Sequence, residues 1–392
     1  MKINHVEAVH LRFEYENGFT YAGGKCTARV TSLVLVHTDT GLTGVGTAYS
    51  HPGMIDLVVN HQLNPLLQGR DPREVEAIWD YMYGVTRWYG RKGAAMTALG
   101  AIDMACWDLR GQDAGKPLWS LLGGTSNQCP AYASSLLWKD PAGLAAEAAQ
   151  HIDDGFRRVK MRLGLGPQED IEAVRAVRDA IGPDNDVLVD GSMRYSVATA
   201  KDLAKTLSEL NAFWYEEPFT PEDLDSFVEL RGQVDVPLAA GENEFGTQGF
   251  RELIRAGAVD IVQPDASRCG GISEVLRVGK MADEAGLRFA THSWSDAVAI
   301  IANAHIVSAL PNGITVEVDR TGNPFVDELL VEPLLVEDGI LRLSDAPGLG
   351  IQLNQAVLDR YRMSDPFNIS PGAYSDMVFG PEFHNPAPPY GT

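Results

Sequence analysis

Hydrophobic and polar residues follow different patterns on the two sides of residue 127. Before it, segment 28–38 is rich in β-branched residues and is followed by a Gly-containing turn and a short apolar run, which predicts a hairpin. From about residue 71 the apolar positions recur every three to four residues, and segment 94–112 predicts a long helix. We therefore expect an N-terminal α+β domain over residues 1–127.

After residue 128, short apolar runs alternate with amphipathic helical segments. This alternation is typical of βα units, whose strands form a parallel sheet. Eight apolar runs predict a closed barrel over residues 128–322, with strands at 130–133, 157–161, 187–189, 213–215, 238–240, 261–262, 287–291 and 314–316. Amphipathic helices are predicted between them, among others at 144–152, 171–181, 198–210, 223–231 and 273–285.

The remaining segment, 323–392, is rich in Pro and Gly and poor in strand-forming runs. We expect one more short strand at 347–351, packed back on the N-terminal domain. The Pro-rich stretch 386–389 is more typical of a surface strap or a disordered end than of a binding motif.

Composition narrows the classes of partner. The chain of 392 residues has 53 acidic and 32 basic side chains and a formal net charge of −21, and such a surface repels nucleic acids and anionic membranes. The N-terminus has no apolar leader core, no apolar run reaches the length of a membrane span, and the four cysteines form no Cys-x-x-Cys pair. We expect a cytoplasmic protein with free thiols and no nucleic-acid or membrane partner.

Ionisable residues follow the predicted strands directly. Successive ones are separated by 30, 26, 26, 23, 27 and 25 residues, which is one βα unit each time. In a barrel of parallel strands these positions lie at the C-terminal rim, where active sites of this architecture form. The residues are Lys160 with Arg162, Asp190, Glu216, Glu242, Asp265, His292 and Glu317.

Asp190, Glu216 and Glu242 follow three successive predicted strands. Because neighbouring strands lie about 4.8 Å apart, three ionised carboxylates there would repel one another unless a cation lay between them. Oxygen ligands without Cys or His select a hard cation, and Mg²⁺ is the abundant one. Three solvated or helix-capping acids are the alternative, and their common spacing makes that alternative the weaker one.

Two further pairs flank these acids. His292 and Asp265 end neighbouring strands, and we expect a hydrogen-bonded pair in which the carboxylate orients the imidazole as a general base; a core or surface His is the alternative. Lys160 and Arg162 share one face of their strand. Two cations there suit an anionic substrate group or the charge of the metal ligands, with surface charges at a strand end as the alternative.

At these residues the chain resembles the enolase superfamily, and within it the mandelate racemase subgroup of sugar-acid dehydratases and racemases. The resemblance covers nearly the whole chain and implies an α/β fold: a modified TIM barrel, (β/α)7β, with an N-terminal α+β capping domain and a C-terminal segment that packs back on the cap. It implies metal ligands Asp190, Glu216 and Glu242, the catalytic pair His292 and Asp265, Glu317 hydrogen-bonded to the substrate carboxylate, and a Lys-x-Lys motif at Lys160-Met161-Arg162.

The chain departs from the subgroup at two positions. The second Lys of the Lys-x-Lys motif is Arg162, whose guanidinium stays protonated and is a poor base, so racemisation that needs a base on each face is disfavoured. Ser192 stands where many relatives carry an Asn near the substrate and the metal.

The resemblance implies a Mg²⁺-dependent lyase that dehydrates an aldonic or aldaric acid. His292 takes the proton α to the carboxylate, Mg²⁺ with Lys160 and Arg162 stabilises the enediolate, and loss of the β-hydroxyl gives a 2-keto-3-deoxy acid. A racemase, epimerase or lactone cycloisomerase acting through the same enediolate is one alternative, and a barrel that binds a sugar acid without turnover is another. The resemblance also implies a homo-oligomer and a small anionic substrate. Cap segments 19–25 and 49–52 contain a Gly pair and polar side chains suited to closing over the barrel and setting the shape of the substrate, with a mobile surface loop as the equal alternative.

Overall fold

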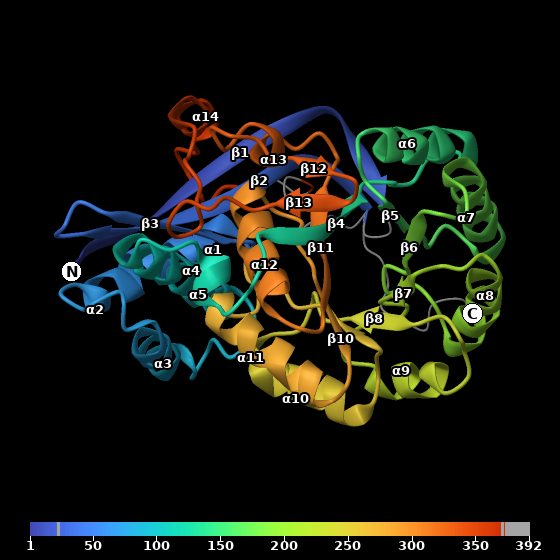
Figure 1. The fold of residues 1–392 in the computed structure, drawn as a ribbon, viewed down its shortest axis with the longest axis horizontal. Helices are drawn as coiled ribbons and strands as arrows, with labels where there is room; N and C mark the ends of the chain where they lie inside the picture. Colours follow the sequence, from blue (N-terminus) through green and yellow to red (C-terminus); the bar gives the residue numbers. More distant parts are fainter. Residues whose placement is uncertain (22–23, 370–371, 373–392) are drawn as a thin grey trace.

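A closed barrel, a cap of sheet and helices and a C-terminal segment make up the molecule (Figure 1). The computed structural model describes residues 1–21, 24–369 and 372. Part of the predicted cap segment 19–25 and the whole of the Pro-rich stretch 386–389 lie outside the described residues. No helix in the described ranges is long and apolar enough to cross a membrane.

The cap is built on a three-stranded antiparallel sheet in the order β1 (Ile3–Tyr21), β2 (Gly24–Thr38) and β3 (Thr43–Ala48). The predicted hairpin corresponds to β2 and β3. The sequence analysis missed β1, although it is 19 residues long. Residues 9–16 alternate strictly between apolar or aromatic and polar side chains, which was a usable strand signal, and β2 supplies a partner along nearly the whole strand.

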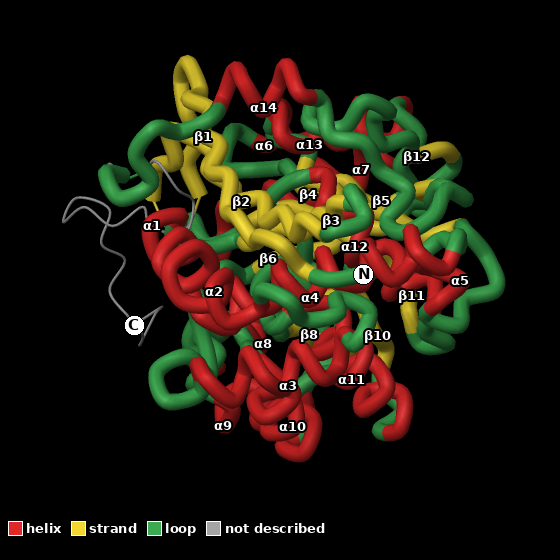
Figure 2. Tube along the Cα trace, turned by 90° about the vertical axis from the view of Figure 1, so that its left-hand side faces the viewer, coloured by secondary structure: helices red, strands yellow, loops and turns green. Residues whose placement is uncertain are grey.

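Helices of the cap begin earlier than expected, at Pro52 rather than near residue 71. Pro52 occupies the first helical turn, where its missing N–H costs nothing, and the His51 side chain accepts a hydrogen bond from Gly53 N. Figure 2 shows α1 and α2 beside the cap sheet. The elements are α1 (Pro52–Asp56), a π-helix (Leu57–Leu63), α2 (Asn64–Leu67), α3 (Val75–Thr86), α4 (Ala94–Ala114) and α5 (Leu118–Leu121).

The long helix α4, which the sequence predicted, joins the cap sheet to the barrel. A Cβ added at Gly46 of β3 would lie 2.0 Å from the carbonyl oxygen of Ala101, so only glycine allows the strand to approach the helix this closely. On its other side, a Cβ at Gly100 would lie 2.5 Å from the backbone nitrogen of Gly271 in the barrel. Because α4 is packed from both sides, its small and apolar residues run around nearly the whole helix.

Eight parallel strands form the barrel, and it closes where β11 pairs with β4. One helix follows each of the first seven strands, which confirms the predicted (β/α)7β order. The strands are β4 (Gln128–Ser134), β5 (Arg158–Arg162), β6 (Asp186–Asp190), β7 (Trp214–Glu216), β8 (Leu238–Ala240), β9 (Ile261–Val262), β10 (Arg288–Thr291) and β11 (Gly313–Asp319). The helices are α6 (Pro141–Asp153), α7 (Pro167–Ile181), α8 (Val197–Glu209), α9 (Leu224–Arg231), α10 (Gly246–Ala256), α11 (Gly271–Glu284) and α12 (Ala297–Ala309).

Apolar side chains fill the barrel below its C-terminal rim. A separate cluster of fully buried residues comes from six different strands: Tyr132, Leu188, Trp214, Ala239, Ile261 and Ala290. Such inward-facing layers make the barrel a packed core rather than a pore. The floor of any site at the rim is therefore apolar.

The C-terminal segment contains α13 (Pro324–Asp327), β12 (Val336–Glu337), β13 (Ile340–Arg342) and α14 (Gln355–Tyr361), and β13 pairs with β4 of the barrel. The strand expected at 347–351 is wrong. Only one isolated bridge forms there, between Gly348 and Pro117. Pro347 has no N–H to donate, and Gly348 and Gly350 have positive φ angles of 73° and 66°, which end an extended chain.

Candidate active site

All eight ionisable residues that the sequence singled out converge at the C-terminal end of the barrel. Lys160 and Arg162 lie on β5, and Asp190 and Glu216 are the last residues of β6 and β7. Glu242, Asp265 and His292 lie one to three residues beyond β8, β9 and β10, whereas Glu317 is inside β11. The regular spacing in sequence therefore corresponds to neighbouring positions around one mouth.

The three carboxylates form the cluster expected of metal ligands. One oxygen from each of Asp190, Glu216 and Glu242 lies within 4.8 Å of the other two. Glu242 Oε2 is buried and accepts no hydrogen bond. A buried carboxylate oxygen without a donor is costly, and a hard cation would satisfy it.

Neighbouring side chains fix the orientation of these acids. Glu216 Oε2 accepts hydrogen bonds from Trp214 Nε1 at 2.9 Å and from Gln263 Nε2 at 3.0 Å. Asp190 Oδ1 accepts from the backbone nitrogen of Ser192 at 2.7 Å and from its hydroxyl at 3.3 Å. Ser192, one of the two departures from the expected pattern, thus holds a carboxylate through a left-handed turn with φ of 52°.

The charge of the cluster also favours a cation. Burial, together with the nearby carboxylates Asp190 and Glu242, raises the pKa of Glu216 to about 7, although Lys160 acts in the opposite direction. A divalent cation among the three acids would offset this mutual repulsion. The donor set therefore fits a divalent metal ion.

His292 and Asp265 form the expected pair. His292 Nδ1 lies 2.8 Å from Asp265 Oδ2, and Asp265 Oδ1 accepts from Ser267 N at 2.8 Å and Asn303 Nδ2 at 3.0 Å. Because the carboxylate accepts on both oxygens, Nδ1 carries the hydrogen and Nε2 faces the mouth. Nε2 lies 3.6 Å from Glu242 Oε2 and 3.8 Å from Glu317 Oε2, longer than an ordinary hydrogen bond.

The surrounding acids make His292 strongly basic. Burial lowers the pKa of His292, but the carboxylates of Glu242, Glu317 and Asp265 outweigh it and raise the pKa to about 9. Positive charge added at the carboxylate triad would oppose this effect.

The two cations on β5 are held by carboxylates. Lys160 Nζ lies 2.7 Å from Glu216 Oε1 and 2.9 Å from Glu317 Oε1, and Arg162 Nη1 contacts Asp190 Oδ2. Burial lowers the pKa of both cations, but the adjacent carboxylates outweigh it, so that each pKa lies above its ordinary value. Both side chains remain charged at neutral pH.

Glu317 is ionised and orders Lys160. Burial raises the pKa of Glu317, but Lys160 and His292 outweigh it and hold the pKa well below its usual range. Glu317 Oε2 also accepts a hydrogen bond from Ser293 N at 2.9 Å. A protonated Glu317 would hydrogen-bond a substrate carboxylate, as the resemblance implies, whereas an ionised Glu317 orders Lys160. The ionised form matches these surroundings.

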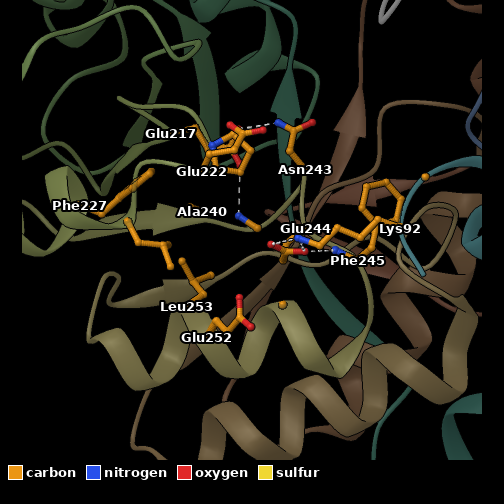
Figure 3. A pocket seen from close by; sticks show the side chains of 15 residues that line it. Lys92, Glu217, Glu222, Phe227, Ala240, Asn243, Glu244, Phe245, Glu252 and Leu253 are labelled. Atoms are coloured by element: carbon orange, nitrogen blue, oxygen red, sulfur yellow. Dashed lines mark hydrogen bonds and ion pairs between the residues drawn. The ribbon is translucent and has the colours of Figure 1, made fainter. Parts of the chain in front are cut away.

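Glu217, the residue directly after β7, faces a different space. Glu217 lines a cavity of about 520 Å³ between the barrel and helices α9 and α10 (Figure 3). Its Oε2 accepts a hydrogen bond from Asn243 Nδ2 at 2.7 Å, and burial raises its pKa to about 8. Glu216 therefore lies in the carboxylate cluster at the mouth, whereas its neighbour Glu217 lies in this separate cavity.

Several side chains that touch these residues were not predicted from the sequence. Trp214 and Gln263 bind Glu216, and Asn303 of α12 binds Asp265. From the cap, the ring of Tyr49 stacks 6.4 Å from that of His292, in the segment 49–52 expected to face the substrate. Trp294, two residues after His292, was not noticed, although its position on the same loop was a usable signal.

Comparison with known proteins agrees with this architecture. The family described as mandelate racemase / muconate lactonizing enzyme, N-terminal domain, matches residues 15–123, and the family described as enolase C-terminal domain-like matches residues 143–357. The chain is 35% identical to a D-galactarolactone cycloisomerase of Agrobacterium fabrum, over 93% of this chain and 100% of that protein. It is 32% identical to an arabinonate dehydratase of Saccharolobus solfataricus, over 83% of this chain and 89% of that protein.

A solved structure shares the fold. The crystal structure of a racemase from Streptomyces coelicolor with bound magnesium has a TM-score of 0.86 and 28% identity, covering 92% of this chain and 100% of that one. The three relatives thus carry three different activities on one architecture. The chain belongs to the enolase superfamily and, within it, to the mandelate racemase / muconate lactonizing enzyme family.

Proposed function

We propose that the protein is a Mg²⁺-dependent dehydratase of an aldonic or aldaric acid. The observation that carries the proposal is one arrangement: a His–Asp pair, three converging carboxylates and two ion-paired cations at a single mouth. The proton α to a carboxylate is only weakly acidic, so its removal needs a positioned base and positive charge beside the carboxylate. The mouth supplies both.

His292 acts as the base. It takes the α-proton on Nε2, while Asp265 holds the imidazole at Nδ1 and stabilises the imidazolium that forms. The imidazolium then returns the proton to the β-hydroxyl, which leaves as water as the carbon–carbon double bond forms. The resulting enol tautomerises to the 2-keto-3-deoxy acid.

The carboxylates Asp190, Glu216 and Glu242 would hold the metal ion. When bound, Mg²⁺ supplies positive charge beside the substrate carboxylate and so stabilises the enediolate. Lys160, positioned by Glu317 at 2.9 Å, adds a permanent positive charge on the same side. Arg162 lies opposite the His–Asp pair and stays protonated, which argues against racemisation by two bases.

Lactone cycloisomerisation is a second candidate, favoured by the 35% identity to the galactarolactone cycloisomerase. It begins with the same removal of an α-proton by one base. In an aldaric acid lactone, the oxygen β to the free carboxylate is the ring oxygen, so its departure opens the ring and no water is lost. The same His–Asp pair serves both reactions, and the substrate decides between them.

A panel of aldonic acids, aldaric acids and their lactones, incubated with Mg²⁺ and followed by NMR, tests the proposal. We expect a 2-keto-3-deoxy acid from at least one member, and no product from the Asp190→Asn and His292→Asn variants. A ring-opened 2-keto-3-deoxy acid of the same mass as the lactone supplied would establish the second candidate instead. Tight binding of a sugar acid and Mg²⁺ without any product would contradict both.

A further inference from the structure

One tryptophan lies against two guanidinium groups above the barrel mouth. The Trp294 ring centroid is 4.5 Å from Arg29 Cζ and 5.0 Å from Arg162 Cζ. Arg29 belongs to β2 of the cap, Arg162 to β5 of the barrel, and Trp294 to the loop between β10 and α12. Three distant segments of the chain therefore meet at one indole.

The position of Trp294 is fixed from several directions. Arg29 Nη1 donates to the backbone carbonyl of Trp294 at 3.3 Å, and Asn323 Nδ2 donates to the carbonyl of the next residue, Ser295, at 2.9 Å. Asp319 Oδ2 accepts from Arg29 Nη2 at 2.8 Å and from Asn323 Nδ2 at 3.0 Å. One buried carboxylate thus ties together both side chains that hold the loop.

These groups are shielded from water. Arg29 is 3% exposed, Trp294 is 5% exposed and Asp319 is 1% exposed. A cation–π contact between shielded groups is stronger than the same contact at a surface. Arg29 is already fully committed to these partners, so it serves as an anchor and is not available to a substrate.

Arg162 depends on this arrangement for its own orientation. One end of its guanidinium contacts the carboxylate of Asp190, and the group lies over the ring of Trp294. A long flexible side chain held by both contacts loses most of its rotamer freedom before substrate binds. Without the ring, the ion pair alone would have to hold it.

We propose that Trp294, anchored from the cap by Arg29, is a positioning residue that fixes the Arg162 guanidinium against Asp190. Arg162 then reaches its final orientation only when the cap, which carries Arg29, is docked on the barrel. The consequence for turnover rests on the proposed function, whereas the positioning of Arg162 does not.

Arginine labelling tests the positioning directly. The full-length protein is treated with phenylglyoxal, with and without Mg²⁺, and the rate at each arginine is followed by peptide mass spectrometry. In Trp294→Leu we expect Arg162 to react about 5- to 30-fold faster, which corresponds to loss of a shielded cation–π contact. Trp294→Phe, which keeps an aromatic face, restores most of the protection.

Two further variants separate positioning from folding. Arg29→Met combined with Asp319→Asn removes the anchor without leaving an unpaired buried charge, and it too should accelerate labelling of Arg162. Trp88→Leu is the matched control, because Trp88 is 83% exposed and its own arginine neighbour, Arg87, lies 5.4 Å from its ring. This control leaves Arg162 unchanged. An unchanged rate at Arg162 in Trp294→Leu, or an equal increase at every arginine, would overturn the proposal.

Turnover gives an independent readout once a substrate is in hand. A positioning role predicts that Trp294→Leu lowers kcat and leaves KM nearly unchanged, because Arg162 is needed in the transition state. If Arg162 is labelled faster in Trp294→Leu but the unaltered protein turns over no sugar acid, only the proposed function is contradicted. Turnover of a sugar acid with unchanged labelling would defeat the positioning role alone.

Discussion

The two sides of the barrel mouth hold their ionisable groups in opposite ways. On one side, Asp265 accepts a hydrogen bond from His292 Nδ1, and His292 Nε2 lies at least 3.6 Å from the nearest carboxylate oxygens, those of Glu242 and Glu317. On the other side, Lys160 lies within 2.9 Å of two carboxylate oxygens. His292 Nε2 is therefore able to accept and return a proton, whereas Lys160 Nζ is occupied by its ion pairs.

This difference assigns separate tasks to the two sides. A group that transfers a proton must have both protonation states within reach, whereas a group that stabilises developing negative charge must stay charged. The carboxylates around Lys160 and Arg162 raise the pKa of each and so secure the charge. We therefore assign all proton transfer to the His292 side.

The largest effect is expected from His292→Asn. Loss of the base should lower kcat by about 10²- to 10⁴-fold, because asparagine keeps the size of the side chain but cannot take the proton. Steady-state kinetics on the sugar acid found in the screen measure this. The control is His61→Asn, at a histidine whose side chain is 69% exposed and which should tolerate the change. Comparable losses in both variants would argue against a specific role for His292.

The metal cluster lies between the two sides, and Asp190→Asn tests it without any substrate. Loss of a residue that hydrogen-bonds to a metal ligand typically weakens metal binding by about 10- to 100-fold. Removing one of the three charged ligands themselves should weaken Mg²⁺ binding by more than that. Titration calorimetry with Mg²⁺ measures the loss. Glu222→Gln, a nearby exposed acid outside the triad, serves as the control. Unweakened binding in Asp190→Asn would show that the ion binds elsewhere.

A pH titration of the metal-free protein tests the raised pKa of His292. The pKa of His292 is raised to about 9 in the folded protein, from 6.5. Its contribution, at most about 3 kcal/mol, is fully present below pH 6.5 and is lost as the pH rises to 9. Denaturant unfolding of metal-free protein, compared with His292→Asn, checks the sign. NMR signals of His292 should titrate near pH 9 without Mg²⁺ and nearer neutrality with it; a midpoint unchanged by Mg²⁺ would contradict the electrostatic argument.

Arg162→Lys should produce the smallest effect. The charge next to Asp190 is kept, but the planar face that contacts Trp294 is lost, so turnover should fall by less than the about 100-fold that marks loss of a general base. Kinetics and chiral analysis of recovered substrate measure it. A loss as large as that of His292→Asn, or the appearance of an epimer in the unaltered protein, would place proton transfer on the cationic side as well.

Periodicity explains why the rim was predictable from sequence. Each βα unit places the residue after its strand at the same level of the barrel. The sequence spacing alone therefore predicted that Asp190, Glu216 and Glu242 are neighbours, without information on tertiary contacts. The order of the barrel and the long helix α4 followed from the same kind of local pattern.

Contacts between distant segments were not predictable in this way. Strand β1 was an exception, because the strict alternation of residues 9–16 was a local signal for it. The helix at Pro52, by contrast, starts with a cap that the periodicity does not reveal. Arg29 and Trp294 are 265 positions apart, and no local pattern marks such a pair. The expected strand at 347–351 failed because its glycines adopt positive φ angles.

Exchange of the α-proton in D₂O tests the central claim most directly, because it reports proton removal before any later step. With the sugar acid found in the screen, we predict that recovered substrate loses its α-proton NMR signal with retained configuration in the unaltered protein. We predict no exchange in His292→Asn. Exchange that persists in His292→Asn, or that yields the inverted configuration, would contradict the assignment of proton transfer to the His292 side alone.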